Sequence, residues 1–274
     1  MGRGRLPIAL LLLAPMCVAQ DARSIVERAV MAWDRNDRLM LDYTYKVRDE
    51  VRELKANGGV KSDHSTLDDV MYIGGKRYFR PLEKDGKPLP AKEEKSEEAK
   101  LERAASEAGR LTEPEHEKRI EDAERDRLKR REQFRDIPEA YDFKLLGETP
   151  IEGRATWEIE ATPRQEYHGK FGGLFRNIEG KLWIDKQDYE WTKVEAEVLD
   201  TFSLGWFLAR INKGTHISYE MTRVNDELWA PGHIALTASA RIALMKKINA
   251  EQEVTFTDYR KFRTDSRIVS SEAP

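Results

Sequence analysis

Cysteine is almost absent from this sequence, which has one among 274 residues, Cys17. With a single thiol the chain cannot form an internal disulfide or a C-x-x-C redox or metal motif. Cys17 also lies in an apolar N-terminal stretch that resembles a cleaved leader, so a thiol nucleophile is not expected. Stability must therefore come from a packed core, and a chain of this length can bury a substantial one.

A large net charge is absent as well. The chain has 50 acidic and 47 basic residues, which gives a net charge of −3. Acidic side chains lie near the basic ones along the sequence, so a nucleic-acid partner is not expected. The longest apolar run, at positions 6–14, is too short to cross a bilayer as a helix.

Catalytic motifs are missing too. The sequence contains no H-E-x-x-H, G-x-S-x-G or P-loop motif. Acidic residues are so numerous that no pair can be singled out as an acid–base couple, and a hydrolase of that kind is our last alternative. We predict no catalytic residue, no metal, no cofactor and no enzymatic activity. The five histidines show no metal-ligand spacing: His64, His116, His168, His216 and His233.

Residues 1–19 have the features of a secretory signal peptide. Two arginines precede the apolar run, and small residues stand just before position 20. The remaining chain would hold no cysteine, which fits the bacterial periplasm. Lipidation of Cys17 is the alternative, although Met16 is bulky for a lipoprotein signal. The chain from 20 to 264 then forms a single domain, and 265–274 is a flexible polar tail.

A predicted β-hairpin at 178–200 is the centre of the remaining sequence. Apolar residues alternate with charged ones in both arms, so one face is dry and the other is wet. A lone hairpin is barely stable, and it therefore needs further strands and a cover. We also expect Trp183 and Trp191 to pair across the two arms. The dry face carries Leu182, Ile184, Val194, Ala196 and Val198.

The other segments supply the strands and the cover. Positions 21–36 show an apolar stripe at helical spacing and should form a covering helix. Asn57-Gly58-Gly59 marks a hairpin, and a polar turn is expected near Asn249. We predict an α+β fold in which about nine to eleven antiparallel strands curl into a half-barrel. Alternating stretches lie at 39–54, 141–161, 216–223 and 234–244, with a last strand near 254–256.

Positions 91–136 differ in composition and predict an inserted, charged helical hairpin. Good helix formers dominate, and Thr112 with Glu115 forms a capping box at the start of the second helix. The predicted helices span 91–108 and 113–134. A solvated insertion is one interpretation. A docking arm is the other, for an envelope protein or for anionic lipid through basic residues 129–131.

Two motifs give a family resemblance. The hairpin GKLWIDK…VEAEV and the turn and strand VNDELWAPGHI resemble the LolA/LolB-like superfamily of outer-membrane lipoprotein carriers. The resemblance implies a half-open barrel with helices as a lid and an apolar interior that holds acyl chains. It also implies an exported protein that carries or senses lipoproteins. The insertion at 91–136 has no counterpart in the short carriers.

Two functions follow as hypotheses. The first is a non-enzymatic periplasmic carrier that binds lipid acyl chains or lipoproteins, and we expect it to be a monomer. The second is an envelope protein-interaction or stress-sensing module that uses 91–136. For the first, candidate ligand contacts come from the apolar, aperiodic stretch 201–211 and from the covering helix and strands, with ordinary core as the alternative role. They are Trp33, Phe202, Leu204, Trp206, Phe207, Leu236 and Ile242.

Overall fold

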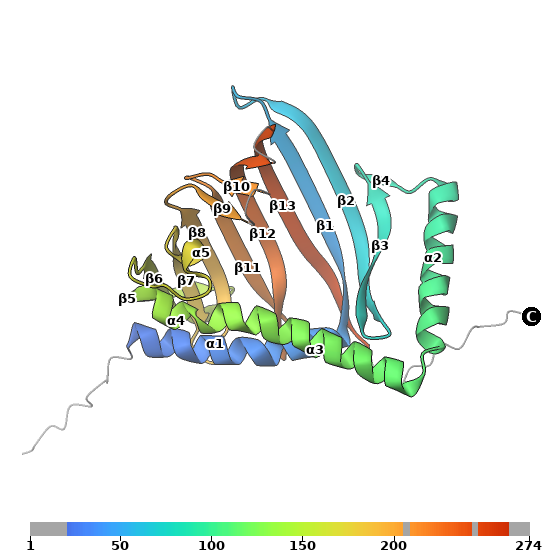
Figure 1. Ribbon diagram of the computed structural model, residues 1–274, viewed down its shortest axis with the longest axis horizontal. Helices are drawn as coiled ribbons and strands as arrows, with labels where there is room; N and C mark the ends of the chain where they lie inside the picture. The colour runs from blue at the N-terminus through green and yellow to red at the C-terminus, as the bar shows by residue number, and fades with distance from the viewer. Residues whose placement is uncertain (1–20, 205–208, 243–245, 263–274) are drawn as a thin grey trace, which may run out of the picture.

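The structure is a computed structural model that describes residues 21–204, 209–242 and 246–262. Thirteen strands form one antiparallel sheet (Figure 1). Eleven of them follow the order β4-β3-β2-β1-β13-β12-β11-β8-β7-β6-β5, and β9 and β10 pair beside β12. The strands are β1 (Tyr43–Leu54), β2 (Val60–Ile73), β3 (Lys76–Lys84), β4 (Lys87–Pro88), β5 (Tyr141–Ile151), β6 (Arg154–Pro163), β7 (Ile178–Asp185), β8 (Trp191–Val198), β9 (Phe202–Leu204), β10 (Ala209–Ile211), β11 (His216–Val224), β12 (Leu228–Ile242) and β13 (Lys246–Lys261).

The sheet is open, because the strands at its two ends, β4 and β5, do not pair with each other. The strands twist strongly along the sheet, and helices α1, α3 and α4 gather at one end of it (Figure 1). The predicted α+β class, with an open antiparallel sheet and an N-terminal helix, is confirmed. The predicted signal peptide and tail lie outside the described residues. The helices are α1 (Ala22–Leu39), η1 (Met40–Asp42), α2 (Ala91–Gly109), α3 (Glu113–Arg135), α4 (Ile137–Ala140) and α5 (Gly172–Phe175).

Strand register divides the sheet into an apolar face and a polar face. Directly paired residues of antiparallel strands point to the same side. We call the side of the sheet on which α1 packs the inner face. Along each strand, the residues that alternate with the inward-pointing ones form the opposite, charged outer face. One inner row runs through Ile159, Leu182, Val194, Tyr219, Ile234 and Val254, and the neighbouring outer row runs through Glu160, Lys181, Glu195 and Ser218.

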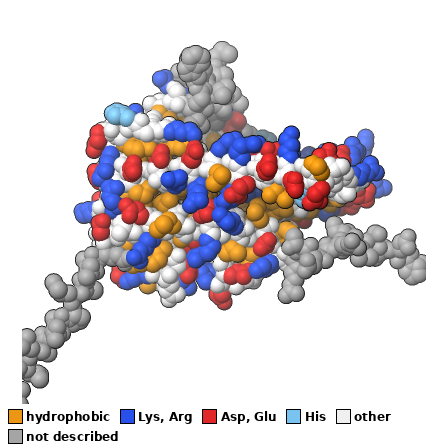
Figure 2. All heavy atoms as spheres, turned by 60° about the horizontal axis from the view of Figure 1, so that its bottom comes forward, with side chains coloured by type: hydrophobic (Ala, Val, Ile, Leu, Met, Phe, Trp, Pro, Cys, Tyr) orange, Lys and Arg blue, Asp and Glu red, His pale blue; other side chains and the backbone are white. Residues whose placement is uncertain are grey.

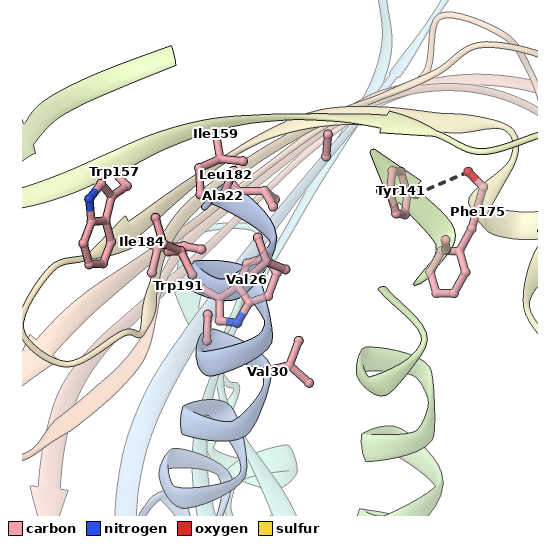
Figure 3. Packing of buried hydrophobic residues seen from close by; sticks show 14 residues of the cluster. Ala22, Val26, Val30, Tyr141, Trp157, Ile159, Phe175, Leu182, Ile184 and Trp191 are labelled. Atoms are coloured by element: carbon pink, nitrogen blue, oxygen red, sulfur yellow. Dashed lines mark hydrogen bonds between the residues drawn. The ribbon is translucent and has the colours of Figure 1, made fainter. Parts of the chain in front are cut away.

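The main core lies between α1 and strands β5 to β8 (Figure 3). The apolar stripe of α1, with Ile25, Val26 and Ala29 fully buried, packs on the inner face. Figure 3 shows Val26 beside Trp191. Tyr141 donates a hydrogen bond to the carbonyl of Phe175 at 3.3 Å, which ties β5 to α5. The predicted stripe on the first helix therefore does cover the sheet.

The two charged helices form close to their predicted ranges but separate in space. A capping box between Thr112 and Glu115 starts α3 as the sequence indicates. Helix α3 lies beside α1, whereas α2 lies beside β3 (Figure 1). The ion pair Arg80–Glu98 joins β3 to α2. The insertion is therefore less a free hairpin than two helices that each contact the rest of the fold.

Two local expectations are wrong. Trp183 and Trp191 do not pair, because the ladder places Lys193 opposite Trp183 and Ile184 opposite Trp191, so the two indole rings lie on opposite faces of the sheet. Asn249 is not in a turn. It lies within β13 and pairs with Ser239 of β12, since the strand pairing already begins at Lys246.

Candidate functional site

The inner face continues beyond the region that α1 covers. On β11, β12, β13 and β1 most of its apolar side chains are only partly buried, although Tyr45 and Met221 are buried. The partly buried side chains contrast with the fully buried residues beneath α1, such as Ile159 and Ile184. This partly exposed apolar surface is the candidate site, and we call it the open inner face. It consists of Val47, Ile217, Tyr219, Ile234, Leu236, Val254 and Phe256.

Two of the candidate ligand contacts share this face. Leu236 lies directly opposite Ile217. Phe202 pairs with Ile211, which in turn pairs with Ala240, four residues along β12 from Leu236. Alternation along the strand therefore places Phe202 and Leu236 on the same side. Both stay predictions as ligand contacts.

The remaining candidates are located as follows. Trp33 does not lie on the open inner face, because its ring stacks on Phe134 of α3, with ring centroids 4.3 Å apart. Leu204 and Ile242 are described only by their strand positions, in β9 and at the end of β12. Trp206 and Phe207 lie outside the described residues. The expected aperiodic segment thus contains a short hairpin, of which β10 pairs with β12.

Helix α3 is held beside α1 mainly by charge. Arg127 is buried and forms ion pairs with Asp34 of α1 and with Glu124 of its own helix. Arg131 lies 3.6 Å from the same Asp34 carboxylate. Together with the Trp33–Phe134 stack, these contacts hold α3 across the end of the sheet where the helices gather.

The side of the molecule that carries α1 and α3 has a mixed surface (Figure 2). Acidic and basic side chains alternate on it, with separate apolar groups between them. The exposed large apolar residues of the two helices are Met31, Ile120 and Leu128. Single apolar residues of this kind are common on soluble surfaces and define no binding patch.

A buried charged network lies at the turn between β7 and β8. Arg154 binds both oxygens of the fully buried Asp185 carboxylate, at 2.6 and 2.8 Å. Asp188 accepts hydrogen bonds from Arg154, Arg223 and the indole of Trp229. Both guanidinium groups also lie over the Trp229 ring, at centroid distances of 5.5 and 5.7 Å. This network fixes the turn against the end of β12.

The C-terminal part of α1 joins this network. The side-chain oxygen of Asn36 accepts a hydrogen bond from the backbone N–H of Trp229 at 3.2 Å. Glu190, in the same turn as Asp188, lies 3.6 Å from the guanidinium of Arg35. Burial raises the pKa of Glu190 to about 7, and Asn36 and Arg35 offset only part of that shift. Glu190 and Asn36 give no functional signal in the sequence, since they stand in what is locally only a polar turn and a helix end.

Polar groups interrupt the open inner face on β1 and β2. Gln252 donates to both carboxylate oxygens of Asp49, at 2.8 and 3.0 Å. Burial raises the pKa of Asp68, which lies opposite Val47. Polar side chains therefore interrupt the apolar surface at Asp49 and Asp68, although apolar residues continue beside them at Val70 on β2, which pairs with Tyr45.

A shallow hollow of about 230 Å³ lies on the outer face instead. Its floor is the backbone at Ala161, Gly180 and Ala196, and charged side chains form its walls. Long side chains of two neighbouring outer rows stand on either side of this backbone, whose own side chains at Ala161 and Ala196 point to the inner face. The wall residues are Glu160, Thr162, Glu179, Lys181, Glu195, Glu197 and His216.

Other classes of site receive no support from the described ranges. No group of three or more His, Cys, Asp or Glu side chains there could hold a metal ion. His216 and His233 lie on adjacent strands, but they pair with Thr237 and Glu220 and not with each other. None of the helices in these ranges is long and apolar enough to span a bilayer.

Comparison with solved structures relates the fold to known proteins. The chain is similar to a LolA superfamily protein, NE2245 from Nitrosomonas europaea, at 11% identity and a TM-score of 0.31, over 89% of this chain and 94% of the other. A DUF1329 family protein from Desulfovibrio piger matches at 12% identity and a TM-score of 0.35, over 89% and 95% of the two chains. The MucA/MucB complex of Pseudomonas aeruginosa matches at 11% and 0.26, over 88% and 99%.

The LolA superfamily, which the two hairpin motifs resemble, is thus among the structural matches. At these identities and TM-scores the similarity concerns the fold alone. No protein-family profile and no curated sequence matches the chain.

Proposed function

We propose that this protein is a periplasmic, non-catalytic carrier that holds acyl chains of a lipid or lipoprotein against the open inner face. The observation that supports the proposal is the largely apolar side of the sheet. Helix α1 and its neighbours bury this side on β5 to β8, whereas on β11, β12, β13 and β1 it stays partly exposed. Partly exposed apolar surface of this extent is typical of a binding site.

The energetics favour an extended apolar ligand. Each methylene group moved from water to this surface contributes about 0.8 kcal/mol. An acyl chain along the row from Tyr219 through Ile234 to Val254 would gain enough to offset the cost of ordering it. The polar side chains near Asp49 suit the headgroup of such a ligand.

The test is a titration of the chain from residue 20 with a fluorescent fatty acid. Leu236→Glu places a charge on the open inner face, and the matched control Thr237→Glu changes the next residue, whose side chain points to the outer face. We expect saturable binding by the unmodified chain and the control, and at least about tenfold weaker binding by Leu236→Glu, because burying an unpaired carboxylate is costly. Absence of saturable binding, or equal binding by the two variants, would disprove the carrier proposal.

A second candidate function is supported by α2. This helix of 19 residues has no buried side chain, and its charged surface could bind an envelope protein. A nineteen-residue helix spans about 28 Å, so replacing it requires a Gly/Ser linker of about twelve residues. If α2 is the docking arm, the shortened protein keeps its fatty-acid affinity and loses its partner in a pull-down. A partner retained by that variant would exclude this role.

A further inference from the structure

A buried carboxyl group without a hydrogen bond lies beneath the end of α1. Glu190 has 1% of its side chain exposed, and neither of its carboxyl oxygens has a hydrogen-bond partner among the described residues. The amide nitrogen of the neighbouring Asn36 also lacks a partner there. Buried polar atoms are normally hydrogen-bonded, so this pair calls for a physical explanation.

The groups around Glu190 compensate its charge poorly. Helix α1 contributes Arg35, which lies 3.6 Å away and is itself largely exposed. The turn contributes Asp185 and Asp188, whose negative charges raise the pKa of Glu190 further. Arg154 of β6 and Arg223 of β11 are engaged by these two aspartates. A negative charge on Glu190 therefore meets the side-chain amide of Asn36 and one partly solvated cation, which favour it, and two like charges, which oppose it.

The position of Glu190 connects it to the cover of the sheet. The residues next to it on α1 also hold β12, through Asn36 and the Trp229 backbone, and α3, through Asp34 and Arg127. The apolar stripe of α1, by contrast, lies in its N-terminal half, where Ile25, Val26 and Ala29 are buried. The C-terminal half of α1 is held by these polar contacts together with two apolar residues, Trp33, which packs against the main core, and Leu39, which packs against Tyr43, Leu228 and Ala230.

We propose that Glu190 is a proton-dependent latch: its neutral form keeps the C-terminal half of α1 seated on the sheet, and loss of the proton releases that half together with α3. The release uncovers more of the open inner face. The latch rests on the proposed function in one respect, since the surface it uncovers is the one to which we assign lipid. The latch makes the uptake and release of that lipid depend on pH.

The direction and window follow from linkage. The carboxyl titrates near 7 in the closed state and near its ordinary value of 4.5 once exposed to water. Opening then releases one proton between these values, so the opening equilibrium constant rises about tenfold for each pH unit from about pH 5 to pH 7. Above this range both states are ionised, and the constant levels off.

Hydrogen exchange followed by mass spectrometry, without any lipid, tests the latch. Protection is measured for peptides from 31–39 and 113–135 at several pH values from 5 to 8 and corrected for the intrinsic exchange rate with an unstructured peptide. We expect the protection of both segments in the unmodified chain to fall about tenfold for each pH unit between pH 5 and pH 7. Glu190→Gln, which keeps the shape and the neutral state, should show no such fall. The control Glu197→Gln, on the exposed side of β8, should behave like the unmodified chain.

Two results would overturn the latch. One is a corrected protection in the unmodified chain that does not change with pH, a measurement that needs no variant to fold. The other is the same pH dependence in Glu190→Gln. Because the exchange measurement contains no ligand, either result is separate from a failure of the fatty-acid titration, which would remove the carrier proposal and leave the opening of α1 as measured.

Discussion

The guanidinium of Arg127, on the highly charged helix α3, is buried against the carboxylate of Asp34 on α1. A helix with so little apolar surface gains little from hydrophobic burial. The attachment of α3 to the fold therefore depends on this ion pair and on the stacking of Phe134 against Trp33. Because α3 lies over α1, whatever loosens this pair also loosens the cover of the sheet.

We expect Arg127→Ala to lower the free energy of unfolding by about 2 kcal/mol, the typical value of hydrogen bonds to charged groups. Arg131 and Arg38 also lie near Asp34 and keep its charge from being unpaired, which limits the loss. Urea denaturation followed by circular dichroism measures the change. Lys129→Ala is the control, since its pair with Asp126 is exposed and should contribute below about 1 kcal/mol. Equal losses in the two variants would show that Arg127 does not anchor the helix.

Arg154→Lys should destabilise the turn between β7 and β8. Lysine cannot reproduce the two-pronged contact with Asp185, and the stacking on Trp229 is weakened, so we expect a loss of about 2 kcal/mol. Thermal unfolding measures it. In Arg164→Lys the same change affects an exposed carboxylate, Asp142, and should leave the midpoint almost unchanged. A midpoint for Arg154→Lys as high as that of this control would contradict the proposed importance of the network.

Gly180→Ala should be strongly unfavourable. A Cβ atom at this position would lie 2.5 Å from the backbone carbonyl oxygen of Glu195, so β7 and β8 would have to separate. Overpacking of this kind costs about 1–3 kcal/mol. Gly109→Ala should have the opposite sign, since open space surrounds that helical glycine in α2 and alanine favours a helix by about 0.5–1 kcal/mol. Denaturation curves of the two variants should thus shift in opposite directions.

Glu190 should make stability fall as pH rises. Its folded pKa of about 7 exceeds its ordinary 4.5, so its contribution is fully present below pH 4.5 and is lost as pH rises through 7. The shift of about 2.5 pH units corresponds to about 3 kcal/mol. The unmodified chain should therefore lose up to this amount of unfolding free energy between pH 4.5 and pH 8, whereas Glu190→Gln should not lose it. A constant difference between the two proteins would contradict the raised pKa.

Hairpins and helices were predictable from the sequence because their signals are local. Alternation placed Leu182 and Ile184 on the dry face, and the capping box at Thr112 marked the start of α3. The predicted pairing of Trp183 with Trp191 is wrong, since the strand register, which alternation alone does not encode, places the two rings on opposite faces of the sheet. Asn249 was mistaken for a turn residue because a polar residue in an exposed strand looks like one in a loop.

The candidate site was predictable only in part. Phe202 and Leu236 share a face because their strands have a regular register. The position of Trp33, by contrast, depends on where α3 packs, and no local pattern indicates that Phe134 will stack on it. Glu190, Asn36 and Trp229 come from a turn, a helix and a strand far apart in the chain. Only the folded chain brings them together.

Strand β1 pairs with β13, so one edge of β1 stays unpaired until β13 is present. Strands β1 to β4 form one meander and strands β5 to β12 another, and β13 is the strand that joins them. A contact of such long range is slow to form, because a loop of about two hundred residues must close first. Until β13 has been synthesised, the two halves cannot join. A premature stop before β13 should therefore yield two unconnected sheets with exposed edges that are prone to aggregate.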